Sequence, residues 1–328
     1  MKMKKNILGV DIGGTKCAVI YGQKEGDTLH LVEKVKFPTT SVDETIANIC
    51  SEIEQMMGRH GLDSSNTGAI GISCGGPLDS KRGVVMSPPN LPGWNDIPIV
   101  RMLEERFGIR TGIHNDANAC ALAEWKFGAG VGTQNMVFLT FGTGLGAGLI
   151  LDGKLYAGTN DNAGELGHIR LSEFGPVGYG KCGSFEGFAS GGGIAQLARF
   201  KVSEKQQMGE SVAWCPPGQL DSISAHTVAL AAASGDPLAL EIYRISATYL
   251  GRGLAMVIDL LNPEVIVIGS IYVRNRELME PFVLQEIERE ALSHARRVCS
   301  VRPAKLGEQI GVEIRIQHQD IFNSMHRI

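Results

Sequence analysis

The chain lacks several features that mark particular protein classes. None of its apolar runs approaches the roughly 20 residues of a membrane-spanning helix, and the most apolar segment, at 254–261, is interrupted by Asp259. The apolar stretch after the N-terminal lysines is too short for a signal-peptide core. The seven cysteines are scattered and odd in number, which is typical of a reducing cytoplasm rather than of a disulfide framework. We therefore expect a cytoplasmic protein with no membrane partner.

The chain also has no excess of positive charge. Its formal net charge is −4, which argues against a broad basic surface for nucleic acid. The hydrophobic share of 43% and the charged share of 20% are ordinary for a globular protein. A length of 328 residues predicts about two domains.

Two familiar phosphate loops are absent as well. A Walker A loop ends in GKS or GKT, neither of which occurs here, and a Rossmann fingerprint needs a helix after its glycines. Instead, Asp-Ile-Gly-Gly-Thr-Lys at 11–16 lies between two apolar runs, 7–10 and 17–21, that we predict to be strands. Gly13 and Gly14 permit the positive φ of a tight hairpin and expose backbone N–H groups that bind anions.

The side chains around these glycines favour a phosphate-binding turn. Thr15 adds a hydroxyl, Lys16 adds a cation, and Asp11 adds a carboxylate suited to a Mg²⁺ shell. An ordinary hairpin with a Gly-Gly turn is the alternative, and the glycines alone do not decide between the two.

The same pattern recurs near the middle of the chain. Strands are predicted at 136–140 and 147–151, with the glycine turn 142–146 between them. Two such units predict a duplicated α/β fold, in which two lobes face each other across a cleft and each offers one phosphate-binding turn. We expect a small lobe at 1–117, rejoined by the chain at about 305–328, and a large lobe at 118–304.

Hydrophobic spacing predicts the other elements. Further strands are expected at 31–37, 69–73 and 265–268, and a strand leads into His114. Helices are expected around Ile46, Ile49 and Ile53, and at 98–107, 117–126, 236–261 and 276–292.

An ordered set of segments resembles the motifs of the ROK family of sugar kinases, the bacterial glucokinase and N-acetylhexosamine kinase group. These segments are DIGGTK at 11–16, PNLPGW at 89–94, HNDANA at 114–119, FGTGLGAG at 141–148, ELGH at 165–168, FEGFASGGG at 185–193 and NPEVIVIG at 262–269. The resemblance implies an actin-like ATPase (ribonuclease H-like) fold, ATP bound between two lobes, and a homodimer.

Phosphoryl transfer to a sugar needs a base, donors for the phosphates, and Mg²⁺. The match to HNDANA nominates Asp116 as the base, since it follows a strand end. Its alternative role is the N-cap of the helix that begins at Ala117, because Asp is favoured at that position. Both roles are compatible.

The resemblance also nominates the binding residues. For the sugar hydroxyls these are Asn90, Asn115, Asp116, Glu165, His168 and Glu186. For the nucleotide they are Asp11 (with Mg²⁺), Gly13, Gly14, Thr15, Lys16, Gly142, Thr143, Gly144 and Gly269. Glu165 and His168 are three apart, which on a helical turn places them on one face. The alternatives are a turn residue for Asn90, a helix-start carboxylate for Glu186 and a core histidine for His168.

The chain departs from the family pattern in three places. Many ROK kinases carry CxCGxxGCxE, whose cysteines bind a structural zinc with the ELGH histidine, but the ligand positions here are Val177, Tyr179 and Ser184. Because a structural site needs four ligands, we expect no zinc. Ser270 stands where the family commonly has a second glycine. After Leu306, alternating Val312, Ile314 and Ile316 predict a strand where the family has a closing helix.

The leading hypothesis is an ATP-dependent kinase acting on the 6-hydroxyl of glucose or a related sugar. N-acetylglucosamine, N-acetylmannosamine, fructose and allose remain alternative acceptors. A second hypothesis is a sugar-responsive repressor, but with a first strand at about residue 6 we expect no preceding helix-turn-helix domain. A third is a non-catalytic sugar-binding or filament-forming relative, against which Asp11, Asp116, Glu165 and His168 argue, whereas the atypical C-terminal sequence keeps it open.

Overall fold

The structure is a computed structural model that describes residues 5–25 and 28–306. Contacts divide the chain into two compact units. The first contains Met1–Val131 and Leu155–Ala163, and the second contains Gly132–Lys154 and Gly164–Gly307. Glu308–Ile328 is grouped with the first unit but lies outside the described residues, as does the strand predicted from Val312, Ile314 and Ile316. The lobe boundaries expected from the sequence stay a prediction.

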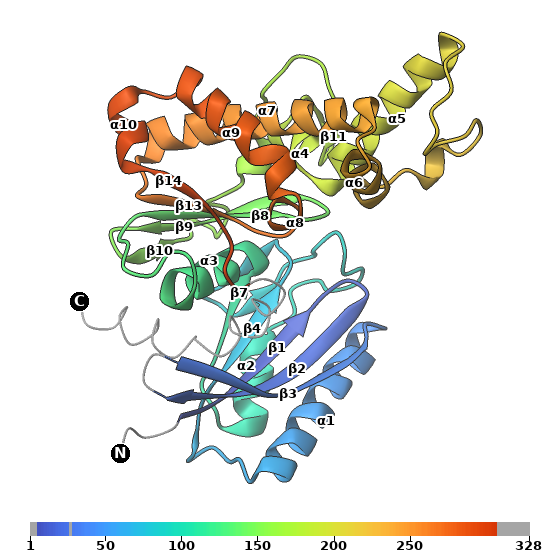
Figure 1. The fold of residues 1–328 in the computed structure, drawn as a ribbon. Coiled ribbons are helices and arrows are strands. Elements are labelled where there is room, and N and C mark those ends of the chain that lie inside the picture. Colours follow the sequence, from blue (N-terminus) through green and yellow to red (C-terminus); the bar gives the residue numbers. More distant parts are fainter. Residues whose placement is uncertain (1–4, 26–27, 307–328) are drawn as a thin grey trace. The chain divides into compact units, whose positions relative to one another are not determined.

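The first unit is built on a five-stranded sheet of order β3-β2-β1-β4-β7 (Figure 1). The antiparallel strands are β1 (Lys5–Ile12), β2 (Lys16–Glu25) and β3 (Thr28–Pro38). The strands β4 (Thr67–Cys74) and β7 (Thr111–Asn115) run parallel to β1. Its helices are α1 (Val42–His60), α2 (Ile99–Phe107) and α3 (Asp116–Phe127), and a small hairpin joins β5 (Leu78–Asp79) to β6 (Val84–Val85).

The second unit repeats this plan. Its five-stranded sheet has the order β10-β9-β8-β13-β14, and the chain passes into the first unit within β10. β8 (Met136–Phe141) and β9 (Leu145–Leu151) are antiparallel, whereas β13 (Val265–Ile268) and β14 (Ser300–Pro303) run parallel to β8; β10 is Lys154–Tyr156. Each sheet therefore places a strand–turn–strand hairpin beside parallel strands, and the predicted duplication is confirmed.

Helices of the second unit cover its sheet, with α7 (Pro237–Leu261) and α9 (Arg276–Glu290) side by side (Figure 1). The other helices are α4 (Phe185–Phe188), α5 (Gly191–Gln207), α6 (Ala225–Ala233), α8 (Ile271–Arg274) and α10 (Ser293–Val298). The 3₁₀ turns η1 (Leu166–His168) and η2 (Leu220–Ser222) and the strands β11 (Val177–Gly178) and β12 (Lys181–Cys182) complete the unit. Among the described helices, none has the length and apolar character to cross a membrane.

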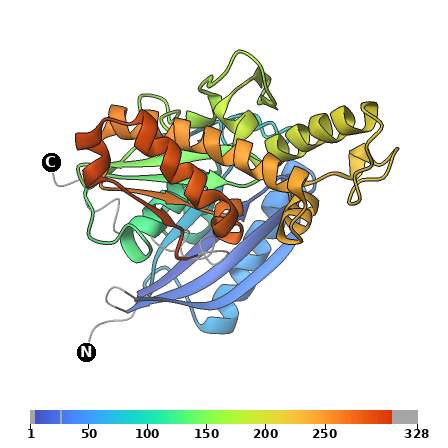
Figure 2. The same cartoon turned by 45° about the horizontal axis from the view of Figure 1, so that its top comes forward.

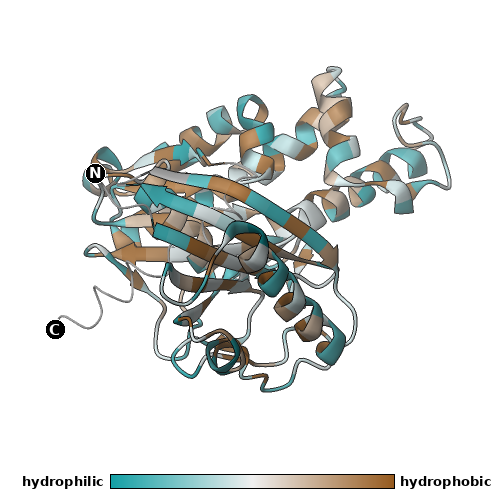
Figure 3. Cartoon of the chain, turned by 90° about the horizontal axis from the view of Figure 1, so that it is seen from below, coloured by the Kyte–Doolittle hydropathy of each residue, from teal (hydrophilic) through white to brown (hydrophobic). Residues whose placement is uncertain are grey.

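Alternation along the strands builds the core of the first unit. Side chains on one face of β2, including Val19, pack into a large apolar cluster that also receives Ile49 and Ile53 of α1. On the opposite face, Ala18 and Ile20 form a smaller cluster with Ile7. Alternating hydrophilic and hydrophobic bands are visible along these strands (Figure 3). The helical spacing read from the sequence is confirmed, and α1 lies against β2 (Figure 2).

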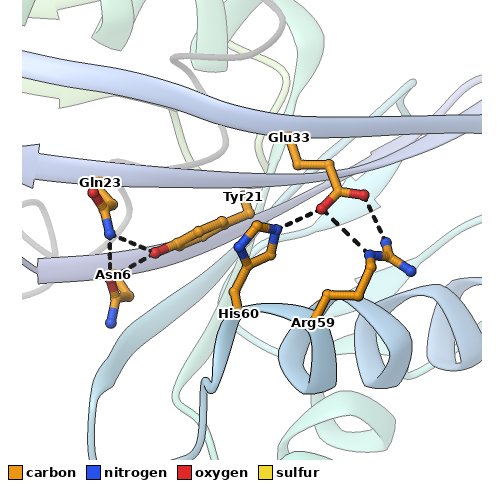
Figure 4. Close-up of polar contacts among 6 residues, drawn as sticks. All are labelled: Asn6, Tyr21, Gln23, Glu33, Arg59 and His60. Carbon is orange, nitrogen blue, oxygen red and sulfur yellow. Dashed lines mark hydrogen bonds and ion pairs between the residues drawn. The ribbon is translucent and has the colours of Figure 1, made fainter.

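A polar cluster ties the end of α1 to the sheet (Figure 4). Arg59 donates to Glu33 Oε1 of β3 over 2.7 Å, and His60 Nε2 lies 2.6 Å from Glu33 Oε2. The hydrogen bond with His60, followed by the one from Arg59, holds the pKa of Glu33 below its usual value. The Tyr21 ring centroid lies 4.7 Å from that of His60, and Tyr21 donates to Asn6. These contacts fix the last turn of α1 on β2 and β3.

Candidate functional site

Three parallel strands of the first unit end side by side. The register pairs Asp11 of β1 with Ser73 of β4, and Ser73 with His114 of β7. Asn115 is paired with Cys74, next to Ser73. Because the carboxyl ends of parallel strands share one edge of a sheet, the candidate metal ligand Asp11 and the Asn115-Asp116 pair lie at that edge. Ligands of open α/β sheets bind at such edges.

Asp116 is held by a neighbour that sequence reasoning missed. The Ser73 hydroxyl donates to Asp116 Oδ1 over 2.6 Å. Ser73 is 4% exposed, whereas Asp116 is exposed. The buried hydroxyl therefore fixes one carboxylate oxygen of a group that faces solvent. The only sequence signal for Ser73 was its place at the end of a buried strand.

The predicted N-cap role of Asp116 is wrong. Asn115 has extended backbone angles and caps α3, because its side chain accepts a hydrogen bond from the Asn118 N–H over 2.8 Å. Asp116 is already the first helical residue. Asn115 satisfies the helix start, and the cap does not engage the Asp116 carboxylate.

The turn at 11–16 forms the expected hairpin between β1 and β2, but its glycines are needed for a different reason than predicted. Gly13 and Gly14 do not adopt positive φ. They are needed for close approach instead: a Cβ on Gly13 would lie 2.8 Å from the Lys16 carbonyl oxygen, and one on Gly14 would collide with the backbone of Asn90. Thr39 fixes the turn from outside by donating its hydroxyl to the Gly13 carbonyl over 2.6 Å.

The same contact brings Asn90 to the turn. Asn90 is exposed and lies in a turn, as its alternative role predicts. Its amide group also lies beside Gly75, within 3.3 Å of where a Cβ would stand. Thr15 and Lys16, which follow Gly14 in the turn, are exposed. The first unit therefore places Asn90 and the phosphate-turn candidates together.

In the second unit, the glycine turn at 142–144 meets the start of α5. The N–H groups of Gly191 and Gly192 donate to the carbonyls of Gly142 and Thr143 over 2.8 and 3.2 Å. Glu186 braces the turn from the other side, because its Oε2 accepts from the Leu145 N–H over 2.9 Å. Glu186 also lies in the first turn of α4, as its alternative role predicts.

An open pocket of about 530 Å³ adjoins this turn within the second unit. Its lining includes Thr143, Gly192, Arg199, His226, Ser270 and Arg274. Gly269 lies just before Ser270 and donates its N–H to the Leu139 carbonyl over 2.9 Å, which holds the end of β13 against β8. The pocket size is typical of small-molecule sites. The sequence prediction missed the three basic side chains, because no motif marks them.

Glu165 and His168 lie on one 3₁₀ turn, in which residues three apart eclipse each other. Both side chains are exposed, so the core alternative for His168 is wrong. Partial removal from water, followed by the charge of Glu186, raises the pKa of Glu165, and His168 opposes this shift. Glu165, His168 and Glu186 are therefore close enough to influence one another.

The donor set around His168 does not fit a structural zinc. The three positions that carry cysteine in many family members hold Val177, Tyr179 and Ser184. Over residues 5–25 and 28–306, no group of three or more His, Cys, Asp or Glu residues could hold a metal ion.

Comparison with known proteins assigns the family. The ROK family model matches residues 7–313. The chain belongs to the ROK family. This ROK protein is 33% identical over 307 residues to a glucokinase of Streptomyces coelicolor, covering 93% of this chain and 94% of that protein.

Solved structures of the family share the fold. A ROK family glucokinase from Streptomyces griseus in complex with glucose and AMPPNP matches with a TM-score of 0.73 and 30% identity, over 95% of this chain and 98% of that one. A ROK family transcriptional regulator, homologous to the Escherichia coli Mlc protein, matches with a TM-score of 0.83 and 27% identity, over 97% of this chain and 79% of that one. The duplicated actin-like ATPase fold expected for this ROK protein is confirmed.

Proposed function

We propose that this protein is an ATP-dependent hexose kinase that phosphorylates the 6-hydroxyl of glucose or a related sugar, with Asp116 as the base. Its family and its glucokinase relative support a sugar phosphotransferase. The observation that carries the catalytic assignment is the Ser73–Asp116 hydrogen bond at the carboxyl edge of the first sheet, on the strand edge that also bears Asp11.

In this proposal Asp116 orients the attacking hydroxyl and accepts its proton late. A carboxylate is a weak base toward an alcohol, so the main contribution of Asp116 is alignment. Phosphoryl transfer has a loose transition state and depends chiefly on positioning and charge stabilisation. The Ser73 hydroxyl, which donates to Asp116 Oδ1, fixes the orientation of this carboxylate.

Sugar hydroxyls are assigned to Asn90, Asn115, Glu165, His168 and Glu186. Their amides, carboxylates and imidazole supply both donors and acceptors, as a polyhydroxylated ligand requires. These residues do not determine which sugar is the acceptor, so N-acetylglucosamine, N-acetylmannosamine and fructose stay alternative acceptors.

The nucleotide is assigned to the two glycine turns. Backbone N–H groups of Gly14 and Gly144, with the Thr15 and Thr143 hydroxyls and Lys16, are the candidate phosphate donors. Gly13 and Gly142 shape the two turns, because their own N–H groups donate to the carbonyls of Lys16 and Gly144 over 3.2 and 3.1 Å. Gly269, beside the 530 Å³ pocket, is assigned to the adenosine. Asp11 fits Mg²⁺, which prefers one or two carboxylates and keeps several waters. Bound Mg²⁺ neutralises developing charge on the phosphates.

The cellular location and the partners of this protein belong to the same proposal. The seven cysteines, which all lie among the described residues, form no disulfide, which agrees with a reducing cytoplasm. The net charge of −4 argues against nucleic acid as a partner. We expect a homodimer, as the family resemblance implies.

The test is an assay that couples ADP formation to sugar addition over a panel of hexoses and N-acetylhexosamines. The proposal predicts turnover with one or a few sugars and a fall of at least about 10³-fold in kcat for Asp116→Asn. Asp43→Asn, an exposed change on α1, serves as the matched control and should keep full activity. Unchanged turnover in Asp116→Asn would remove Asp116 as the base.

A second candidate is a sugar-binding regulator without kinase activity. The TM-score of 0.83 to the ROK transcriptional regulator favours it. Calorimetric binding of a sugar, with no ADP formation for any sugar in the panel, would replace the kinase proposal with this one.

A further inference from the structure

The segment 169–184 carries a network of protein contacts at each position where many family members have a zinc ligand. The first such position is Val177 of β11, whose backbone is gripped by one side chain. The Val177 N–H donates to Gln196 Oε1 over 3.0 Å, and Gln196 Nε2 donates to the Val177 carbonyl over 2.8 Å. Gln196 belongs to α5, which begins at the glycine turn, so this pair fastens the segment to that helix.

The second position, Tyr179, faces the histidine that would complete a zinc site. The Tyr179 and His168 rings meet edge to face, with centroids 6.3 Å apart and an interplanar angle of 75°. Lys181, two residues further on, donates from Nζ to the His168 carbonyl over 2.7 Å. The 3₁₀ turn that carries His168 is therefore held by the segment through a ring contact and a hydrogen bond to a charged donor, which is the stronger kind.

The third position, Ser184, begins the helix that carries Glu186. The Ser184 hydroxyl is fully buried and accepts from the Gly187 N–H over 3.1 Å, which makes Ser184 the N-cap of α4. Gly178 of β11 packs on the same helix, since a Cβ there would lie 2.7 Å from the Cβ of Glu186. Strand β11, which Gln196 holds, is therefore in contact with Glu186, whose carboxylate accepts from the glycine turn at Leu145.

We propose that this protein replaces the family's structural zinc with a metal-free clamp, in which Gln196 and Lys181 are positioning residues for the sugar-binding side chains Glu186 and His168. The clamp acts through β11 on Glu186 and through the His168 carbonyl on the 3₁₀ turn. The positioning role rests on the proposed sugar kinase function, whereas the existence of the metal-free clamp does not.

The decisive variant is Gln196→Leu, which removes both bonds to Val177 and keeps a similar side-chain volume. Amide exchange of Val177 reports the clamp directly, because that N–H is one of the bonded groups. We expect this amide to be protected in the wild type, equally in the presence of a strong chelator, and to exchange about tenfold faster or more in Gln196→Leu. Elemental analysis should find zinc far below one per chain.

The kinetic arm tests positioning. Gln196→Leu should raise the KM for the sugar about tenfold, because displaced binding groups weaken their contacts, while the KM for ATP stays within about twofold. Lys181→Met should shift the sugar KM in the same direction. The matched control is Gln206→Leu on the same helix, which loses one bond to the Cys215 carbonyl and should leave the sugar KM unchanged.

The outcomes separate the two claims. Stoichiometric zinc, or faster Val177 exchange on chelation, would overturn the metal-free clamp. Faster exchange in Gln196→Leu with an unchanged sugar KM would overturn its positioning role. A wild type that turns over no sugar would refute the proposed function, and the exchange arm would still decide whether the clamp exists.

Discussion

At the scale of single residues, the candidate base depends on a buried neighbour. Ser73 donates to Asp116 Oδ1, and the pair joins the end of β4 to the start of α3. A hydrogen bond to a charged group contributes about 1.5–3 kcal/mol. We therefore expect Ser73→Ala to lower kcat by about tenfold or more, since Asp116 loses its fixed orientation, and to leave the sugar KM within about twofold.

Steady-state kinetics on the best sugar found in the panel would measure both parameters. Ser51→Ala, on an exposed position of α1, is the control for handling and should match the wild type. A raised sugar KM with an unchanged kcat would show that Ser73 supports sugar binding instead of the base.

Ser270 is a residue in a conformation suited to glycine. Its φ is 50° and its ψ is −109°, a region that L-residues rarely adopt. This explains physically why a second glycine suits this position after β13. A backbone strained in this way costs about 1–3 kcal/mol. A glycine at this position would relieve the strain, but its greater conformational freedom in the unfolded chain would offset part of the gain in stability.

We expect Ser270→Gly to raise the free energy of unfolding of the second unit by about 1 kcal/mol. Hydrogen exchange of the β8 and β13 amides would measure it. Ser270→Ala keeps the strained backbone and should give no gain. Equal stabilisation by alanine would show that the hydroxyl, and not the backbone, is the source of the effect.

At the scale of elements, local patterns predicted most of the fold. The strand–turn–strand units and the spacing of Ile46, Ile49 and Ile53 predicted β1, β2, β8, β9 and α1, because their periodicity reflects a single buried face. The helix expected at 276–292 ends earlier, at Glu290, and α10 follows it. The positive φ expected at Gly13 and Gly14 was wrong. Gly14 is needed because a Cβ there would collide with the backbone of Asn90, which is distant in the sequence and which a local pattern cannot reveal.

The candidate site was predictable only where a motif marked it. The residues taken from the family resemblance lie at strand ends, in turns and in short helices, and their roles stay predictions. Ser73, Gln196 and Arg274 carry no motif, because their partners are distant in the sequence: Ser73 meets Asp116, and Gln196 meets Val177. Such contacts follow from sheet order and helix packing, and these arise only when the whole unit is folded.

At the scale of the whole molecule, the two sheets repeat one strand order, and each ends its parallel strands beside a glycine turn. At the carboxyl edge of the first sheet, a histidine is buried, and its burial affects the stability of the first unit. His114 lies at that edge, near the end of β7, and is 8% exposed. Burial lowers the pKa of His114 to about 4, and the charge of Asp161 opposes the shift only partly.

The lowered pKa of His114 makes the first unit less stable at acidic pH. Between about pH 6.5 and pH 4 the unfolded chain binds a proton at His114 that the folded unit does not. The first unit should therefore lose stability as the pH falls through this window, by about 3 kcal/mol in total from this residue. Hydrogen exchange of the β4 and β7 amides, measured across the window, would follow the loss, and His114→Asn should flatten it. The matched control His30→Asn changes an exposed histidine and should keep the wild-type slope. Direct titration of the His114 ring by NMR guards against a variant that folds poorly, and protonation of that ring near pH 6.5 would refute the prediction.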